Sequence, residues 1–587
     1  MATETRMTKY PMTSIKEPNR TNACSPWLAF LFVFSIQHAA CAIITVTSLA
    51  DDLGNPSTLR TAVNSAIDGD TIVFADALKG FTITLLNGEM PVGKNLTIIG
   101  PPDASITIVG GNLISPLNQR IFHVTDPGVG PDTIRTFQVS GLRMQGSIIA
   151  ANGANGTDVT PAGGSGANPG GLIEDHGGGG AIYCEANTLL VASNCYFLNC
   201  VAKGGNGGDA YNANCSPVAA GGMGGSAGGG AIFSFGDCFL YNCSFYTNTA
   251  IGGLGGGGAQ GGEGGNGGDG LGGAIAVGYH AGHDLRIINC TFYGNIAFGG
   301  DGGVGGTGFF CFSPIPTNGG TGGTGGTSRG GAIYDRQRVE PPTGIIHSTV
   351  YNNYCYRGGG GGGGTGILEG LNGAIGGVGG AYGGGLIIVA SPVRAANNLF
   401  AGNRALPTTA IPLGPDVHGT LLSEGHNLVA NPANCDGLVL SDLRGTVALP
   451  INALLGPFQN NGGFMPTLAP LQGSPAIDAG TLSGVPLDEI GQTRAVVASG
   501  IVNGGDGSDI GAYEVQCGNV SPRLYIFSNG ASVTVKWPAP SFCSKLQSSQ
   551  DLIIWSDYLG AVAVVGDMHQ VFLNGQVSPF FYRLIPR

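Results

Sequence analysis

The sequence predicts an all-β fold: a right-handed parallel β-helix with an N-terminal cap and a small C-terminal β module. Two signals, Gly-Gly-Ala-Ile and Phe-x-x-Asn, recur together along the middle of the chain. The runs between them are short and strand-like, as at 188–192, 238–241 and 285–288, and they lack helical periodicity. Short strands that repeat, and that cannot each bury an apolar face alone, are typical of stacked coils.

The first signal is expected to form the corners of the coils, since Gly takes positive φ without strain and Ala fits a crowded interior. It recurs at intervals of 43 to 58 residues, with Gly-rich insertions of variable length between the copies. The copies begin at Gly179, Gly229, Gly272, Gly330 and, in a looser form, Gly384. We expect the insertions to be flexible surface loops.

Three residue types recur at fixed places in the repeats and predict internal stacks. The aromatic members are Phe197, Phe245, Phe292 and Phe400. The amides that follow them, expected to turn the chain and form a ladder, are Asn248, Asn295, Asn353 and Asn403. The equivalent thiols are Cys195, Cys243 and Cys290, which indicates a stack along the solenoid rather than a disulfide framework.

Residues 1–42 predict an export signal, because basic residues precede an apolar run over 27–36 that ends in the small-residue site Ala40-Cys41-Ala42. A single membrane anchor is the alternative, but this run is too short for a helix that crosses about 30 Å of hydrocarbon. A lipoprotein signal is disfavoured by His38, where an aliphatic residue is usual. The expected location is secreted or at the cell surface, with outer-membrane association through an unknown anchor.

Residues 43–125 are expected to hold the N-terminal cap and the first coils, since a solenoid needs its end covered. Within them, 58–66 predicts one short helix and 69–74 the first strand. Further strand-like runs lie at 81–86, 95–99, 106–109 and 121–124. The predicted domains that follow are the Gly-rich repeats (126–435), the end of the β-helix (436–516) and a small all-β module (517–587).

Composition excludes some partners. The chain has 587 residues with a formal net charge of -12, and its pI is near 5.1. Nucleic acid and anionic membranes both require a basic face, and no basic cluster occurs in the sequence. We therefore expect no nucleic-acid partner.

The repeats resemble those of the polymorphic outer membrane proteins of chlamydiae, a family of β-helical surface adhesins with the pectin lyase-like fold. The runs from Phe245 to Asn248, Phe292 to Asn295 and Phe400 to Asn403 match the second signal fully. Two copies depart from it, with Cys200 in place of Asn and Val350 in place of Phe. The resemblance implies a solenoid that acts in adhesion.

The downstream region is similar to secreted bacterial β-helix proteins with a choice-of-anchor Q-type domain. The similarity lies in the run from Pro475 to Gly480 and in the run from Ser508 to Glu514. Residues 57–74 resemble the N-terminal segment often found with that domain. The end of the chain, from Leu546 to Leu584, is similar to C-terminal modules of exported verrucomicrobial and planctomycete proteins. These resemblances say little about biochemical activity.

We predict no catalytic, cofactor-binding or metal site. A calcium lyase needs converging carboxylates and an inverting hydrolase needs a spaced pair, but the acidic residues of the repeats are sparse. Asp175-His176 and residues 335–338 are expected to lie in solvated loops. His280 and His283 are the one close His pair, and no cysteine or carboxylate lies beside them at metal-ligand spacing.

Calcium is a weaker alternative. The runs from Gly204 to Asp209 and from Gly264 to Asp269 match the opening of the calcium-binding nonapeptide of β-rolls. Such sites need adjacent nonapeptides, whereas these two lie sixty residues apart. A flexible surface loop is therefore expected at both places.

The sequence thus predicts a non-enzymatic exported surface protein, a β-helical scaffold for adhesion or display. A cell-surface or glycan ligand is expected to bind along the side faces of the helix, with no cofactor. The alternative is a polysaccharide lyase or glycoside hydrolase of the same fold, because fold alone does not decide function.

Overall fold

The structure is a computed structural model, and it confirms the predicted all-β fold class. It describes residues 41–586 except 112–119, 129–132, 150–161, 166–177, 212–217, 279–283, 310–316, 337–343, 407–412, 498–502, 517–523, 530–531, 539–543, 559, 566–567 and 575–580. No helix in the described part of the chain is long and apolar enough to cross a membrane.

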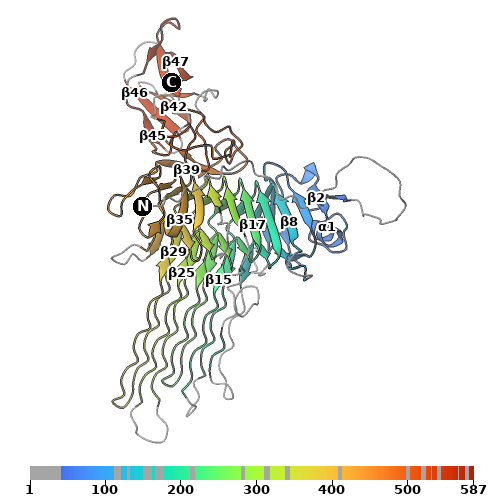
Figure 1. The fold of residues 1–587 in the computed structure, drawn as a ribbon, viewed down its shortest axis with the longest axis vertical. Helices are drawn as coiled ribbons and strands as arrows, with labels where there is room; N and C mark the ends of the chain where they lie inside the picture. Colours follow the sequence, from blue (N-terminus) through green and yellow to red (C-terminus); the bar gives the residue numbers. More distant parts are fainter. Residues whose placement is uncertain are drawn as a thin grey trace, which may run out of the picture.

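Three long parallel sheets form the body of the molecule (Figure 1), and each receives one strand from almost every coil. Sheet A contains β1 (Ile43–Val46), β2 (Asp70–Phe74), β5 (Leu96–Ile99), β8 (Arg135–Ser140), β12 (Thr188–Ser193), β17 (Asp237–Tyr241), β22 (Leu285–Ile288), β27 (Gly344–Ile346), β32 (Val393–Ala396) and β35 (Val417–Gly425). Sheet B contains β3 (Thr82–Leu85), β6 (Ile106–Gly110), β9 (Leu142–Gln145), β13 (Tyr196–Leu198), β18 (Ser244–Tyr246), β23 (Thr291–Tyr293), β28 (Thr349–Tyr351), β33 (Leu399–Ala401), β36 (Leu428–Val429) and β38 (Leu443–Arg444).

Sheet C shares β35 with sheet A and contains β4 (Met90–Val92), β7 (Phe122–Val124), β11 (Ile182–Cys184), β16 (Ile232–Ser234), β21 (Ile275–Val277), β26 (Ile333–Asp335) and β31 (Leu386–Ile388). One further strand, β37 (Cys435–Asp436), pairs with β35. Two shorter sheets leave the body together. Sheet E contains β10 (Ser147–Ile149), β14 (Val201–Lys203), β19 (Thr249–Ile251), β24 (Ile296–Phe298), β29 (Tyr354–Tyr356) and β34 (Arg404–Leu406). Sheet F contains β15 (Ala227–Gly228), β20 (Gly270–Leu271), β25 (Ser328–Arg329) and β30 (Ala381–Tyr382).

The N-terminal cap contains the predicted helix as α1 (Leu59–Ser65), followed by a short 3-10 turn, η1 (Asp76–Leu78). The Thr58 hydroxyl caps the helix by accepting from the Thr61 N–H. The strand expected to be first is in fact second, because β1 precedes it and pairs with it. The sequence analysis also missed β4, a three-residue strand with a Pro at its centre.

The interior ladders are confirmed, except that the aromatic stack does not continue to Phe400. The rings of Phe197, Phe245 and Phe292 stack with centroids 4.7 and 4.6 Å apart and planes within 3°. Val350 separates this stack from Phe400, because β28 carries Val at the aromatic position. All these side chains are fully buried, so one continuous apolar column fills the body.

The amide ladder runs beside the apolar column. Asn248 donates from its backbone and side-chain N–H groups to the Oδ1 of Asn295, at 3.0 and 2.9 Å, and Asn295 does the same to Asn353. Each amide therefore satisfies the turn of the preceding coil. The expected thiol stack is also present: Cys195, Cys243 and Cys290 are buried and unbridged, and the Cys243 N–H contacts the Cys290 sulfur at 3.4 Å.

The C-terminal part first covers the body and then leaves it. Residues 451–515, which we call the docking segment, contain the antiparallel pair β39 (Leu455–Gln459) and β40 (Thr467–Pro470). The predicted all-β module follows, at the opposite end of the long axis from the Gly-rich arms (Figure 1). Its strands are β41 (Tyr525–Asn529), β42 (Ser532–Pro538), β43 (Ser544–Ser549), β44 (Ser556–Asp557), β45 (Ala563–Val565), β46 (Met568–Asn574) and β47 (Phe581–Pro586).

Candidate binding surface

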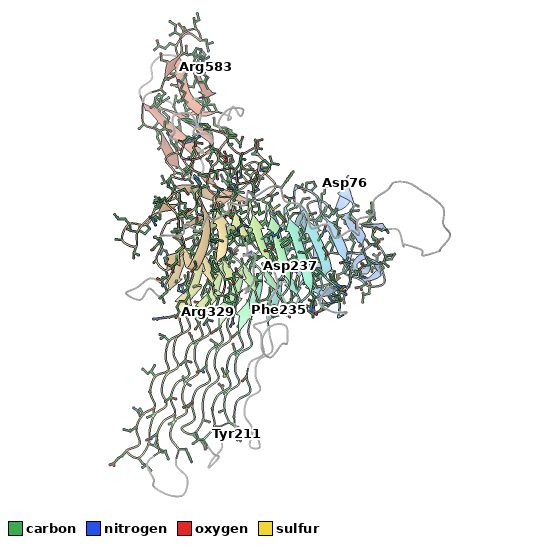
Figure 2. The ribbon with its side chains drawn as sticks, in the orientation of Figure 1. Asp76, Tyr211, Phe235, Asp237, Arg329 and Arg583 are labelled. Carbon is green, nitrogen blue, oxygen red and sulfur yellow. The ribbon has the colours of Figure 1, made fainter. Side chains whose placement is uncertain are left out.

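The described parts of the Gly-rich insertions form a regular hydrogen-bonded array, so the expectation of flexible loops is wrong for them. Four arms leave the body side by side as extended chains (Figure 1), each with an outgoing half that follows sheet E and a returning half that leads into sheet F. In Figure 2, Tyr211 lies far out on the first arm and Arg329 lies where the third returns to the body. We call this array the glycine blade, and we number as its first to fourth arms the described residues of 204–226, 252–269, 299–327 and 358–380. Gly163 and Gly164 of the preceding insertion bond the first arm.

Backbone hydrogen bonds between arms hold the glycine blade together. Adjacent glycines donate in different directions: Gly255 to the Asp301 carbonyl of the next arm and Gly256 to the Gly222 carbonyl of the arm before, both at 2.8 Å. The bonding repeats every third residue, as at Gly252 and Gly253. An extended chain with a period of three, bonded to its neighbours rather than to itself, has the features of the polyproline II conformation.

This packing leaves no room for side chains at two positions in three. A Cβ on Gly265 would lie 1.8 Å from the Gly222 carbonyl oxygen, and one on Gly323 would lie 1.9 Å from that of Gly265. The requirement is steric rather than conformational, since neither glycine has positive φ. It is the same constraint that demands Gly at the crowded axis of collagen.

The third position points outward and completes the bonding. Side-chain oxygens there accept backbone N–H groups from the next arm: Asn206 from Leu254 at 3.0 Å and Asp209 from Gly257 at 2.7 Å. Asn266 and Asp269 do the same for Thr324 and Thr327 in the third arm. The Gly-Gly-Asn-Gly-Gly-Asp runs considered for calcium thus use these oxygens to bond the neighbouring arm.

The outer face of sheet E carries a row of apolar and aromatic side chains. The register places Ile251, Phe298 and Tyr356 in line on successive coils, with strands about 4.8 Å apart. The Phe298 and Tyr356 rings are 4.9 Å apart and within 14°, and Tyr354 lies 6.0 Å from Tyr356. These side chains are half-buried, so part of each ring faces solvent.

Cations flank this aromatic row. Lys203 begins the row beside Ile251, and Arg404 pairs in register with Tyr354. Arg357 follows Tyr356 directly. Neither arginine forms an ion pair within the described part of the chain. On a molecule with a net charge of -12, this face therefore combines apolar area with unneutralised positive charge.

A second polar group, which the sequence analysis missed, lies on the first coils of sheet C. His123 bonds Glu89 through Nδ1 at 2.9 Å and Glu185 through Nε2 at 2.8 Å. Arg120 bonds the other Glu89 oxygen at 2.9 Å and lies over the Tyr183 ring. These residues are distant in sequence, and only the register of β4, β7 and β11 brings them together.

The acid and base of this group favour their charged forms. Burial alone would raise the pKa of the Glu89 carboxyl, but the contacts with His123 and Arg120 outweigh it and lower that pKa. Burial likewise opposes protonation of His123, whereas its hydrogen bonds to Glu89 and Glu185 raise its pKa. The group is consequently a network of mutually paired charges.

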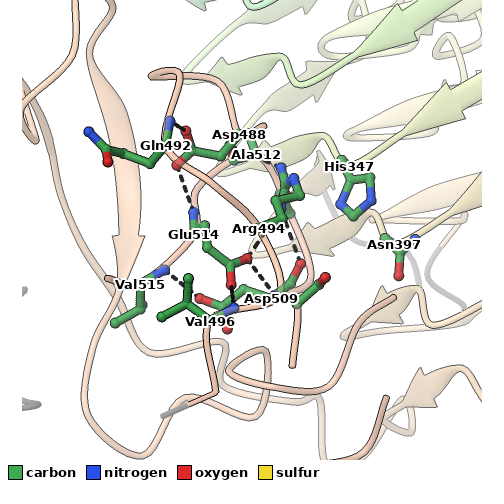
Figure 3. A network of polar contacts seen from close by, with 12 residues as sticks. His347, Asn397, Asp488, Gln492, Arg494, Val496, Asp509, Ala512, Glu514 and Val515 are labelled. Carbon is green, nitrogen blue, oxygen red and sulfur yellow. Dashed lines mark hydrogen bonds and ion pairs between the residues drawn. The ribbon is translucent and has the colours of Figure 1, made fainter. Parts of the chain in front are cut away.

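A third polar group joins the docking segment to the body (Figure 3). Arg494 is buried and donates to the Asn289 side chain at 2.9 Å and to the Gly511 carbonyl at 3.0 Å. Glu489 accepts hydroxyl bonds from Ser244 at 2.8 Å and from Thr291. Arg494 and Glu489 therefore dock this segment across two coils.

Burial dominates the protonation of these carboxyls. It raises the pKa of Asp509 to about 7 and that of Glu514 to about 9, even though both accept backbone N–H groups. The Glu514 carboxylate accepts from the Asp509 N–H at 2.8 Å, and its other oxygen accepts from the Val496 N–H at 3.1 Å. At low pH the site therefore favours protonated, hydrogen-bonded carboxyls beside Arg494, whose guanidinium lies 3.6 Å from Glu514.

The structure places few of the polar spots singled out in the sequence. Asp335 is buried at the end of β26 rather than in a solvated loop. Asp175, His176, His280 and His283 lie outside the described residues. Among the described residues, no group of three or more His, Cys, Asp or Glu side chains could hold a metal ion.

Comparisons with known proteins add no family. No protein-family model matches the chain, and searches of curated proteins and of solved structures gave no significant match. The fold defines the class: this is a mostly parallel-strand protein with stacked sheets, consistent with a β-helix.

Proposed function

We propose that this chain is a non-enzymatic exported surface protein that uses the β-helix and the glycine blade as a rigid scaffold for adhesion or display. The observation that carries the proposal is the continuous face made by sheet E and the outgoing arms. It is apolar and partly exposed along the Ile251, Phe298 and Tyr356 row. Exposed apolar area on a rigid element is typical of interaction sites.

The outer faces of sheets B and C are less suited to a ligand. The docking segment covers sheet B, where Phe458 packs against Tyr246 and Tyr293 at 4.9 and 5.3 Å. On sheet C the outward row contains Tyr183, Phe233 and others that are already buried. The resemblance of the repeats to chlamydial surface adhesins agrees with a binding role.

The charge of the face indicates an anionic glycan at the cell surface as the ligand. Arg357 and Arg404 supply positive charge beside Tyr354 and Tyr356. Tyrosine combines an apolar ring with a hydroxyl that hydrogen-bonds, which suits the mixed surface of a sugar chain. Attachment to an outer membrane through an unknown anchor is part of the same proposal.

Binding of purified protein to immobilised alginate and polygalacturonate, with neutral dextran for comparison, tests this function. Phe298→Ala/Tyr356→Ala should weaken binding at least tenfold, about 1.4 kcal/mol. Arg357→Gln/Arg404→Gln should weaken it and reduce its dependence on salt. Thr321→Ala/Thr324→Ala, on the returning half of the third arm, is the matched control. Equal binding by all variants, or no binding by the parent to any anionic glycan, would contradict the proposal.

The alternative function, a polysaccharide lyase or hydrolase, has one observation in its favour: Glu89 and Glu185 lie on opposite sides of His123. Both carboxylates already bond His123, so we favour the scaffold. Release of reducing or unsaturated ends from the same glycans, abolished by Glu185→Gln, would reverse that preference.

A further inference from the structure

The returning half of each arm carries glycines that face the outgoing half of the next arm. Cβ atoms on Gly264 and Gly267 would lie 2.0 and 1.9 Å from carbonyl oxygens of the third arm. Gly319, Gly322 and Gly325 face the fourth arm in the same way, at 1.9 to 2.2 Å. Glycine at this position is therefore what allows another arm to pack.

The fourth arm breaks this rule at its returning half. Gly373 and Gly376 still face back onto Gly320 and Gly323, at 1.8 and 1.9 Å, which fixes the alignment. The position that faces forward in the other arms is occupied here by Asn372, Ile375 and Val378, each directly before a glycine that faces back. Ile375 is 77% exposed and Val378 is 56% exposed.

Two other features end the array at the same arm. Its outward positions Gly359 and Gly362 have no side chain, whereas Asp301 in the third arm accepts the Gly359 N–H at 2.6 Å. The Asn372 amide oxygen turns back to its own arm and accepts the Gly366 N–H at 2.9 Å. The fourth arm thus offers no side-chain oxygen at Gly359 and Gly362 for a following arm.

Some backbone donors nevertheless remain on this edge. In the third arm Gly302 and Gly305 donate to the fourth; the equivalent Gly360 and Gly363 N–H groups have no partner in the described part of the chain. An open row of donors on an extended chain is a template for another chain, and β-sheet edges are protected from this by bulky or charged side chains.

We infer that the fourth arm is an end cap: Ile375 and Val378 fill the space that a Gly-rich arm of a second copy of this chain would occupy. The cap keeps the glycine blade from growing edge to edge between molecules. Leu371, which is 74% exposed but points outward at the third position, has no part in this exclusion. The inference is independent of any ligand.

Sedimentation velocity of the full chain over a range of concentrations tests the cap. Ile375→Gly/Val378→Gly should associate with an affinity at least tenfold higher than the parent, and Val378→Gly alone should associate less than the double variant. The matched control, Leu371→Gly/Ala374→Gly, adds the same two glycines at outward positions and should behave as the parent.

Hydrogen exchange at Gly361 and Gly364, whose N–H groups bond the third arm, reports whether the fourth arm stays packed in each variant. A packed fourth arm without increased association would overturn the inference, as would equal association of the control. If the double variant loses this protection, Val378→Gly alone is tested. Increased association with the fourth arm still packed supports the inference, and unchanged association overturns it.

Discussion

The body and the glycine blade both stack successive stretches of the chain, but in opposite ways. In the body, side chains fill the interior, and one Phe or Asn per coil packs on its equivalent. In the glycine blade, the interior contains backbone alone, and a single Cβ would overlap a neighbour. The body has a period of two and the glycine blade a period of three. Repetition can therefore build an ordered stack either by burying side chains or by removing them.

The largest effect is expected in the body. Phe292→Ala removes the last ring of the stack, which lies between Phe245, at 4.6 Å, and Val350, and it should cost about 3 to 5 kcal/mol of unfolding free energy. Urea denaturation measures it. Phe298→Ala, at a half-buried position in the next strand along the same coil, is the control and should cost clearly less. Equal costs would mean that the column is not the main source of stability.

In the glycine blade, adding a side chain should destabilise the protein, as removing one does in the body. Gly265→Ala places a methyl group against the Gly222 carbonyl and should cost about 3 kcal/mol, at the upper end for overpacking. Hydrogen exchange should locate the loss in the second arm and its neighbours. Thr321→Ala, at an exposed third position, should be nearly neutral. Unchanged protection in Gly265→Ala would show that the arms are not packed as described.

The sequence predicted the body well and the arms poorly, for a physical reason. Apolar residues with a period of two, such as the run 188–192, indicate a strand because they bury one face. The arms bury no side chains, so hydrophobic periodicity carries no signal there. The informative pattern was Gly at two positions in three with Asn, Asp or Thr at the third, as in 264–269, and it was interpreted as loop composition.

The candidate surface was predictable only in part. Phe298 and Tyr356 occupy equivalent repeat positions, so their alignment follows from the spacing of the signals. The group around His123 could not be found this way, because Glu89 and Glu185 belong to coils of unequal length. Neither could the contacts of Glu489, which depend on how the docking segment folds back by about two hundred residues.

Alkaline pH should weaken the docking segment while leaving the arms unaffected. Asp509 and Glu514 have folded pKa values raised to about 7 and about 9. Their contribution to stability is therefore complete below the unfolded pKa values, near 4, and is lost as pH rises through about 7 and then about 9. Between pH 7 and 9 we expect a loss on the order of 2 kcal/mol, measured as a falling urea midpoint.

Glu514→Gln isolates that effect, because the amide stays neutral at every pH. The variant should show a flatter profile above pH 7 than the parent, whereas Thr321→Ala should keep the parent profile. A parent that gains stability between pH 7 and 9 would show that Glu514 is ionised in the folded protein at neutral pH.

The smallest expected effects concern the same kind of hydrogen bond in the two regions. Asn295 accepts the Asn248 N–H of the preceding coil at 3.0 Å and is fully buried. Asn266 accepts the Thr324 N–H of the following arm at 2.9 Å and is exposed. Asn295→Ala removes the acceptor of the buried Asn248 N–H, which water cannot reach, and should cost about 1 to 2 kcal/mol. Asn266→Ala lets water replace the lost oxygen at Thr324, so it should cost less than about 0.5 kcal/mol. Urea denaturation measures the first and hydrogen exchange at Thr324 the second. A larger loss for Asn266→Ala would mean that the outward side chains, rather than the glycine backbone, hold the arms together.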